Sequence, residues 1–414
     1  MTVKLFRNAH IFTPIDKGRA LKGAEQGKIA EINNGAILTN CGMIEKIGPE
    51  ADVLKGLDFK SVHEERDLGG VCVVPGFVDA HTHMCFAKRR EDEFGMRLAG
   101  IPYLEILKRG GGILSSVNAI KEASEEELFE TTWENVMAAL GKGTTSVEIK
   151  SGYGLDMELE LKMLRVIARI ARETPLDVCP TFMGAHAVPV EYKGRADEYI
   201  DLLINQMLPA VKEQGLAEFC DVFCEEGVFT VEQSRKLLKA AKAMGFGTRI
   251  HADEVYDLGG AALAAELQVN SAEHLLAASE DGLKAMGKAG SIAVLIPATA
   301  YSLKKPYARG RDMVDWDVPV ALGTDCNPGS CFCESMPFVF GLAVMNMNMT
   351  VEEALVGSTL NAAYVINRAK KLGSLEVGKQ ADFLLLDGEA PTTLAYHAGS
   401  TSIIEVYKRA EYVA

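Results

Sequence analysis

The sequence predicts an α/β protein: a (β/α)8 barrel of the TIM type, with a small β-sandwich domain built from both chain ends. Three observations predict this fold. Eight apolar runs have the length of buried strands, segments of helical periodicity lie between them, and short β-like runs occupy both ends of the chain. With 414 residues, 48% of them hydrophobic, the chain can bury a large core and form more than one domain.

The predicted barrel strands alternate with predicted helices, as strands of a parallel barrel do. The strands are 73–83, 144–151, 177–186, 220–227, 248–254, 271–275, 291–297 and 319–325. Two helix starts carry the capping-box pattern, Ser124 with Glu127 and Thr230 with Gln233. Gly245 is typical of a residue that follows a helix C-terminus.

The chain segments before and after the predicted barrel contain short β-like runs, which predict the strands of one further domain. We expect residues 1–68 and 373–414 to form its two parts, and residues 69–372 to form the barrel. The expected strand runs are 29–32, 36–38, 43–48, 378–387 and 403–407, the first two separated by the turn-like 33–35 and the third preceded by Asn40.

Two histidines end the first predicted barrel strand. In an extended segment residues i and i+2 share a face, so His81 and His83 can reach one ion together. Neutral imidazole is a preferred ligand of zinc and iron, and a catalytic metal needs three or four protein ligands. Two polar side chains at a strand edge are the alternative interpretation of this pair.

Further metal-ligating side chains end later predicted strands. They are His186, His251, His274 and Asp325. Each alone is compatible with a core histidine or a helix-capping aspartate. Because the C-terminal ends of barrel strands meet at one face, five histidines and an aspartate at these ends predict a single site there.

Composition narrows the function classes. A net charge of −14 argues against nucleic-acid binding, and an anionic substrate would need a local positive charge.

The N-terminus lacks an apolar leader and no apolar run approaches about 20 residues, so we expect no membrane span and a cytoplasmic location. The nine cysteines predict reduced thiols, and we do not expect Cys331 or Cys333 to bind metal.

Several motifs resemble the amidohydrolase superfamily. These are 75–83, His251, His274, 323–325 and 378–382. A second set resembles, more narrowly, the imidazolonepropionase family: Arg90 with 93–94, 110–113, 147–155, 184–189, 251–254 and 325–330. Enzymes of that family open the ring of 4-imidazolone-5-propanoate to give N-formimino-L-glutamate in histidine degradation.

The resemblance implies a role for each matching residue. It implies one zinc or iron ion per chain, held by His81, His83, His251 and Asp325, with His274 near the nucleophilic water. It implies that substrate or product is bound by Arg90, Tyr153, His186, Glu254, Asn327, Gly329 and Ser330.

Physical chemistry supports these roles independently. A metal lowers the pKa of bound water from about 15.7 toward about 7, which supplies a nucleophile for opening a cyclic amide. Asp325 and His274 are then the natural proton acceptors. Glu254 could carry a proton to the departing ring nitrogen, although a solvated loop carboxylate is the alternative. Arg90 could grip the propionate of a small anionic heterocycle in two parallel hydrogen bonds.

The position of lysine predicts the number of metal ions. Two-metal members of the superfamily commonly bridge their ions with a carboxylated lysine on the fourth strand, and here that strand ends at 224–227 without a lysine. Lys150 ends the second strand instead, so we expect a mononuclear site. A deaminase of heterocyclic amines and a barrel without catalysis remain alternatives, and base rates favour a homodimer.

Overall fold

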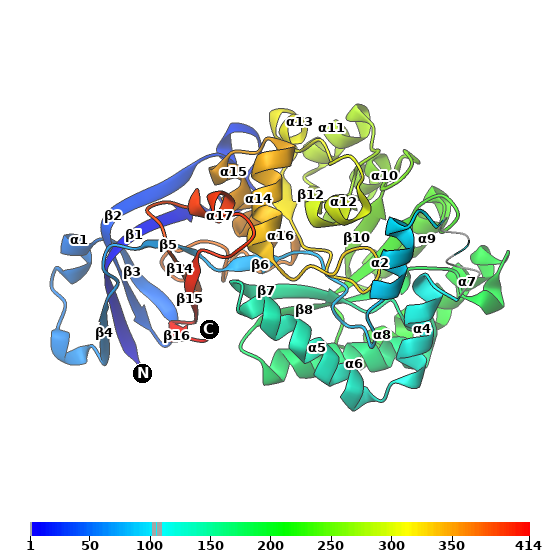
Figure 1. Cartoon of the computed structure of the whole chain (residues 1–414), viewed down its shortest axis with the longest axis horizontal. Coiled ribbons are helices and arrows are strands. Elements are labelled where there is room, and N and C mark those ends of the chain that lie inside the picture. Colours follow the sequence, from blue (N-terminus) through cyan, green and yellow to red (C-terminus); the bar gives the residue numbers. More distant parts are fainter. Residues whose placement is uncertain (1, 102–104, 106–109) are drawn as a thin grey trace.

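The computed structural model describes residues 2–101, 105 and 110–414, which form two eight-stranded sheets (Figure 1). One is a nearly closed parallel barrel. Its strands in order are β6 (Phe77–Asp79), β7 (Thr144–Lys150), β8 (Asp177–Ala185), β9 (Phe219–Cys224), β10 (Gly247–Ala252), β11 (Ser271–His274), β12 (Ile292–Leu295) and β13 (Val320–Leu322). Each overlaps one strand predicted from the sequence, so the barrel prediction is confirmed.

The first predicted strand is wrong in one respect, because it divides into two. Residues 72–75 form β5 (Cys72–Pro75), which pairs with the second sheet, and only β6 belongs to the barrel. The division falls at Pro75 and Gly76, where a Cβ on Gly76 would lie 2.4 Å from Thr145 Oγ1. His81 and His83 therefore follow β6 instead of lying on it.

The barrel seam between β6 and β13 is bridged beyond the strand ends. Asp325 N donates to His81 O at 2.9 Å, and His83 N donates to Cys326 O at 2.9 Å. Just below these contacts, the buried carboxylate of Asp79 accepts hydrogen bonds from the amide and hydroxyl of Thr324, at 3.0 and 2.6 Å. Two chain segments far apart in sequence are thus held side by side at the carboxyl end of the barrel.

The second sheet is mixed and contains both ends of the chain. Its strands are β1 (Val3–Pro14), β2 (Ile29–Asn40), β3 (Met43–Pro49), β4 (Glu64–Asp67), β5, β14 (Phe383–Leu386), β15 (Ile403–Lys408) and β16 (Glu411–Tyr412). β1 was not predicted, and the predicted break at 33–35 is wrong because β2 runs through it. Gly35 pairs with Ala9 of β1 and with Pro49 of β3, so this segment lies within the sheet although its residues are typical of a turn. The predicted boundaries at 68 and 373 stay predictions.

Helices lie around the barrel, on its outside and at its carboxyl end (Figure 1). They are α2 (Glu91–Leu98), α4 (Ile113–Glu122), α5 (Glu125–Leu140), α6 (Met157–Glu173), α7 (Ala196–Leu202), α8 (Leu208–Gln214), α9 (Val231–Ala243), α10 (Gly260–Leu267), α11 (Glu280–Ala289), α12 (Pro297–Leu303), α13 (Gly310–Asp315), α14 (Met336–Met347), α15 (Val351–Ser358) and α16 (Leu360–Val365). Of two further short helices, α1 (Glu50–Leu54) packs against β2 and β3 of the mixed sheet, and α17 (Thr393–Tyr396) packs against α14. Buried apolar residues of β7 and α6, among them Val147, Ile149 and Leu164, belong to one core.

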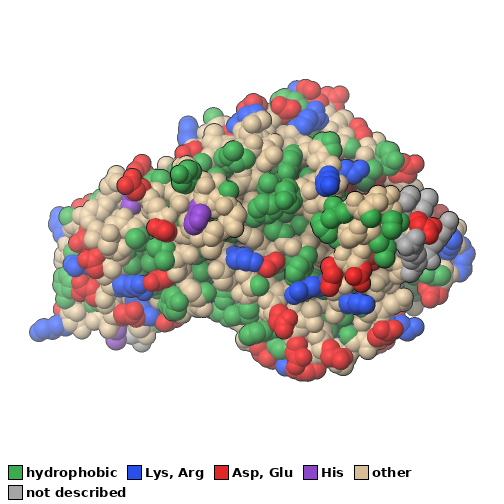
Figure 2. Space-filling model, in the orientation of Figure 1, with side chains coloured by type: hydrophobic (Ala, Val, Ile, Leu, Met, Phe, Trp, Pro, Cys, Tyr) green, Lys and Arg blue, Asp and Glu red, His purple; other side chains and the backbone are tan. Residues whose placement is uncertain are grey.

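The predicted helix signals are present. Ser124 and Thr230 are N-caps of complete capping boxes, and Gly245 follows the C-cap of α9 with φ +85°. Within the described residues, no helix is long and apolar enough to cross a bilayer. On the face drawn in Figure 2, basic and acidic side chains are interspersed, and hydrophobic side chains gather near its middle.

Candidate active site

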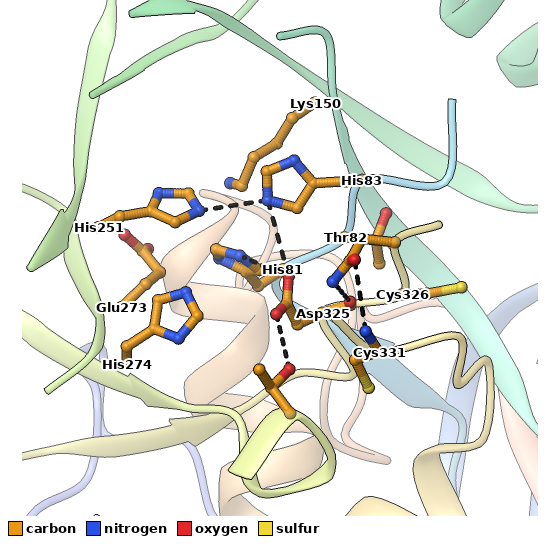
Figure 3. A network of polar contacts seen from close by, with 12 residues as sticks. His81, Thr82, His83, Lys150, His251, Glu273, His274, Asp325, Cys326 and Cys331 are labelled. Atoms are coloured by element: carbon orange, nitrogen blue, oxygen red, sulfur yellow. Dashed lines mark hydrogen bonds and ion pairs between the residues drawn. The ribbon is translucent and has the colours of Figure 1, made fainter. Parts of the chain in front are cut away.

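The four predicted metal ligands lie together at the carboxyl end of the barrel (Figure 3). Nε2 of His83 is 3.2 Å from Nε2 of His251, and Oδ1 of Asp325 is 3.5 Å from Nε2 of His81 and 3.7 Å from Nε2 of His83. All four side chains are buried. The seam contacts after β6 and β13 bring His81, His83 and Asp325 to one point, and β10 supplies His251.

This donor set fits a metal ion. Two ring nitrogens of neutral imidazoles that face each other at 3.2 Å need a proton or a cation between them. Zinc bound at about 2.0 to 2.1 Å in a tetrahedron separates two nitrogen ligands by about 3.3 to 3.4 Å, which is close to this distance. Both ring nitrogens of His81 are buried and find no hydrogen-bond partner in the part of the chain that the structure describes.

The environment keeps these imidazoles neutral, as metal ligation requires. Burial lowers the pKa of His81 well below its usual value, and the positive charge of Lys150 lowers it further. Burial also lowers the pKa of His251 to about 3. Burial raises the pKa of Asp325 to about 6, although its Oδ2 accepts a hydrogen bond from Thr299 Oγ1 at 2.6 Å. Because a bound cation favours the ionised carboxylate, Asp325 would serve as an anionic ligand.

His274 and Glu254 form a second pair beside the donors. One ligand atom of His274 lies within 4.8 Å of one from His81 and one from Asp325. Its Nε2 is 3.8 Å from Oε2 of Glu254. Burial raises the pKa of the Glu254 carboxyl to about 7, so this group can both hold and release a proton near neutral pH.

Tyr153 and His186 line the other side of the donor cluster. The His186 ring stacks on the His83 ring with centroids 4.9 Å apart, and the Tyr153 ring is 5.2 Å from His186. Nδ1 of His186 is 2.9 Å from the carbonyl oxygen of Gly152, so Nδ1 carries the proton and Nε2 is left as an acceptor. Burial lowers the pKa of His186 to about 4, which keeps the ring neutral.

Arg90 lies on the loop before α2, in a cavity of about 740 Å³ that Gly329 and Ser330 also line. A Cβ on Gly329 would lie 1.4 Å from Nη2 of Arg90, so the guanidinium packs directly on this glycine. Among the described residues, Nη1 of Arg90 donates only a long hydrogen bond, 3.4 Å, to Ser116, and Nε is 3.6 Å from Glu93. The guanidinium therefore retains donor capacity toward an anion.

Asn327 shapes the loop after β13. Its Oδ1 accepts from the amides of Gly329 and Ser330 at 2.9 and 2.8 Å, and its Nδ2 donates to the carbonyl of Asp325 at 2.7 Å. The Cys331 thiol donates a hydrogen bond to the carbonyl oxygen of Thr324, and the Cys333 thiol donates one to the carbonyl oxygen of Ser335. Neither cysteine belongs to a group of possible metal ligands among the described residues.

Sequence reasoning missed two supporting features. The buried carboxylate of Glu160 accepts from the amides of Gly152, Gly154 and Leu155, and so fixes the loop that carries Tyr153. The second feature is a layer of buried charged side chains beneath the donor cluster: Glu148, Lys150, Asp221, Arg249 and Glu273. Charged residues inside apolar strand runs such as 147–150 were the available signal.

Comparison with known proteins identifies the family of this chain. The amidohydrolase family model matches residues 72–413. A guanine deaminase of E. coli has a similar structure, with a TM-score of 0.75 and 14% identity over 100% of this chain and 99% of that one. A triazine hydrolase variant is similar with a TM-score of 0.76 and 16% identity, over 100% and 94% of the two chains. The chain belongs to the amidohydrolase family.

Relatives of higher identity define the family more narrowly. The imidazolonepropionase of Syntrophobacter fumaroxidans is 59% identical over 99% of this chain and 97% of its own length. That of Desulfotalea psychrophila is 59% identical over 100% of both chains. Within the amidohydrolases, this chain therefore belongs with the imidazolonepropionases.

Proposed function

We propose that this chain hydrolyses the cyclic amide of 4-imidazolone-5-propanoate to N-formimino-L-glutamate, a step of histidine degradation. The observation that carries the proposal is the convergence of the buried donors, with His83 and His251 nitrogens 3.2 Å apart, in a chain 59% identical to imidazolonepropionases. The substrate is a small anionic heterocycle, and nucleic acid and membrane have no part in the reaction.

One zinc or iron ion per chain would be held by His81, His83, His251 and Asp325. Imidazole and carboxylate donors suit both metals. When bound, such an ion polarises a carbonyl oxygen and lowers the pKa of water, which supplies hydroxide at neutral pH. The neutral state of the buried histidines supports this assignment.

The chain's own residues move the protons. Hydrolysis adds a hydroxyl group to the ring carbonyl carbon, breaks its bond to nitrogen and transfers one proton to that nitrogen. His274 and Asp325, which lie beside each other at the donor cluster, would accept the proton of the attacking water. Glu254, whose pKa is about 7 because it is buried, can deliver a proton to the leaving nitrogen.

Arg90 and its neighbours in the cavity, together with the ring side chains beside His83, would orient the substrate. Arg90 would bind the propionate, and the backbone around Gly329 and Ser330, shaped by Asn327, would add contacts near the same carboxylate. Tyr153 and His186, beside His83, would contact the ring. A propionate held at one end and a ring held at the other places the scissile amide beside the donor cluster.

A direct assay tests the proposal. Ultraviolet absorbance follows the consumption of 4-imidazolone-5-propanoate by purified protein, with and without a chelator, and guanine serves as the alternative substrate. We expect turnover of the imidazolone, its loss with chelator and its recovery with added zinc or iron. Turnover of guanine but not of the imidazolone would replace the proposal with a deaminase.

Two further properties stay proposals. We propose a homodimer, which is the commonest assembly of soluble enzymes, and a cytoplasmic location. Mass measurement in solution tests the first, and cell fractionation tests the second.

A further inference from the structure

A layer of charged side chains lies directly beneath the candidate metal ligands. Glu148 and Lys150 come from β7, Asp221 from β9, Arg249 from β10 and Glu273 from β11, and all five are fully buried. Figure 3 shows the end of the Lys150 side chain directed toward the ligand rings. Burying five charges is costly unless each is paired and hydrogen bonded, so this layer calls for a role beyond stability.

Each carboxylate of the layer holds the chain at or beside a ligand. Oδ1 of Asp221 lies 3.1 Å from Nδ1 of His251. Oε2 of Glu148 accepts from the amide of Thr82, the residue between the other two histidine ligands, at 3.2 Å. Oε2 of Glu273 accepts from the amide of Ile250 at 3.1 Å, directly before His251.

The two cations hold the carboxylates in place. Nζ of Lys150 is 2.8 Å from Oε1 of Glu148 and 2.9 Å from Oδ2 of Asp221. Nη2 of Arg249 is 2.9 Å from Oε1 of Glu273 and donates to the carbonyl of Ala80, directly before His81, at 2.6 Å. The layer therefore ties four barrel strands and the ligand segment after β6 into one unit.

We propose that Asp221 and Lys150 are positioning residues of the metal site. Asp221 accepts the Nδ1 proton of His251 and so leaves Nε2, with its lone pair, facing His83. Lys150 fixes the Asp221 carboxylate in that place, and it also occupies the space where a second cation would balance Glu148 and Asp221. This inference rests on the proposed metal site. It concerns how tightly the ion is held and does not depend on which substrate is turned over.

A purely electrostatic role for Lys150 predicts the opposite sign. If Lys150 were only a positive charge near the ion, its removal would tighten the binding of a divalent cation. If it positions Asp221, its removal leaves two buried carboxylates that share a proton, and the hold on His251 is lost. The direction of the affinity change therefore separates the two roles.

Zinc affinity, measured by competition with a chromophoric chelator, tests the proposal without any activity assay. We expect Asp221→Asn and Lys150→Met each to weaken zinc binding about 10- to 100-fold while one ion per chain still binds at saturation. Adding Glu148→Gln to Lys150→Met removes the unpaired carboxylate and should recover stability but not affinity. Lys408→Met is the matched control.

Lys408 is a good control because it is also a buried lysine between two carboxylates. Its Nζ is 2.6 Å from Asp382 and 2.5 Å from Asp177, at the start of β8 and thus at the opposite end of the barrel from the ligands. We expect Lys408→Met to lower the melting temperature while leaving zinc affinity within about twofold, as for a distant independent site. Tighter or unchanged zinc binding in Lys150→Met would overturn the positioning role.

A measurement on the unaltered protein keeps the inference testable if the variants do not fold. The imidazole N–H proton of His251, hydrogen bonded to a carboxylate, should give a downfield proton NMR signal both without metal and with zinc. A signal that resists exchange with water in both states supports a His251 ring that Asp221 holds in one tautomer and orientation before the metal binds. Its absence from the metal-free protein would overturn the inference. A failure of the imidazolone assay alone would leave this result intact.

Discussion

The histidines after β6 become donors through the backbone contacts around them. His81 O accepts from Asp325 N, and His83 N donates to Cys326 O, so the two segments of the seam fix each other. A pattern of residues could predict the pair, since i and i+2 share a face of an extended segment. The contacts that hold it depend on the loop after β13, which is more than 240 positions away in the sequence.

Replacement of His83 tests the metal assignment directly. We expect His83→Ala to lose bound metal and nearly all turnover while the barrel stays folded, because this ring lies at the site and outside the strands. Elemental analysis and circular dichroism measure the two quantities. A variant that kept full metal content and full activity would remove His83 from the site.

Arg90 is the test of substrate charge. We expect Arg90→Met to raise KM strongly and to cost about 2 to 5 kcal/mol in kcat/KM if the ion pair with the propionate is desolvated. A neutral analogue without the carboxylate should be affected far less. Equal losses for both substrates would show that Arg90 is structural or contacts the reacting ring.

Glu254 gives a prediction about pH. Its pKa is raised by burial to about 7, so the carboxyl holds its proton below that pH and loses it above. If Glu254 donates a proton to the leaving nitrogen, kcat/KM should fall as the pH rises through about 7. Glu254→Gln should be slower by about 10² to 10⁴-fold and lack this limb. A limb that persists unchanged in the variant would assign it to another group.

At the scale of elements, strand positions were predictable and strand limits were not. Apolar runs predicted all eight barrel strands, and the capping boxes at Ser124 and Thr230 predicted two helix starts. Pro75 and Gly76 were the available signal for the split of the first strand. The path of β2 through Gly35 could not be predicted, because its partner β1 supplies the pairing from a distance.

The site shows the same division. The candidate ligands His81, His83, His251 and Asp325 stood at or just beyond strand ends and could be predicted. Charges within apolar strand runs could mark Lys150 as buried, but the roles of Glu160, Asp221 and Lys150 could not be predicted, because these roles are defined by which amide or ring lies opposite them in space. Local sequence does not contain that information.

The loop after β13 provides a prediction at the element scale. A Cβ at position 329 would lie 1.4 Å from Nη2 of Arg90, so the guanidinium has to move in Gly329→Ala. We expect a loss of about 1.5 to 3 kcal/mol in kcat/KM for the anionic substrate, the worth of a hydrogen bond to a charged group. Because the end of Arg90 can shift, unfolding stability should change little. Loss of stability with unchanged kinetics would contradict this placement.

At the scale of the whole molecule, the mixed sheet unites both chain ends and is tied to the barrel. Lys408 on β15 contacts Asp177 at the start of β8, and Gly76 N donates to Asp382 O at 2.9 Å, next to β6. The mixed sheet thus supports the amino end of the barrel, while the opposite end carries the site. Such a separation lets catalytic loops vary without disturbing the core.

We propose that one metal ion, held by His81, His83, His251 and Asp325, supports hydrolysis of the imidazolone ring. The most direct measurement is a titration of metal-free protein with zinc, and separately with iron(II), while ultraviolet absorbance follows 4-imidazolone-5-propanoate. We predict that turnover rises in proportion to added metal and reaches its maximum at one equivalent per chain. Turnover that needs no metal, or that rises to a maximum only at two equivalents, would contradict the account.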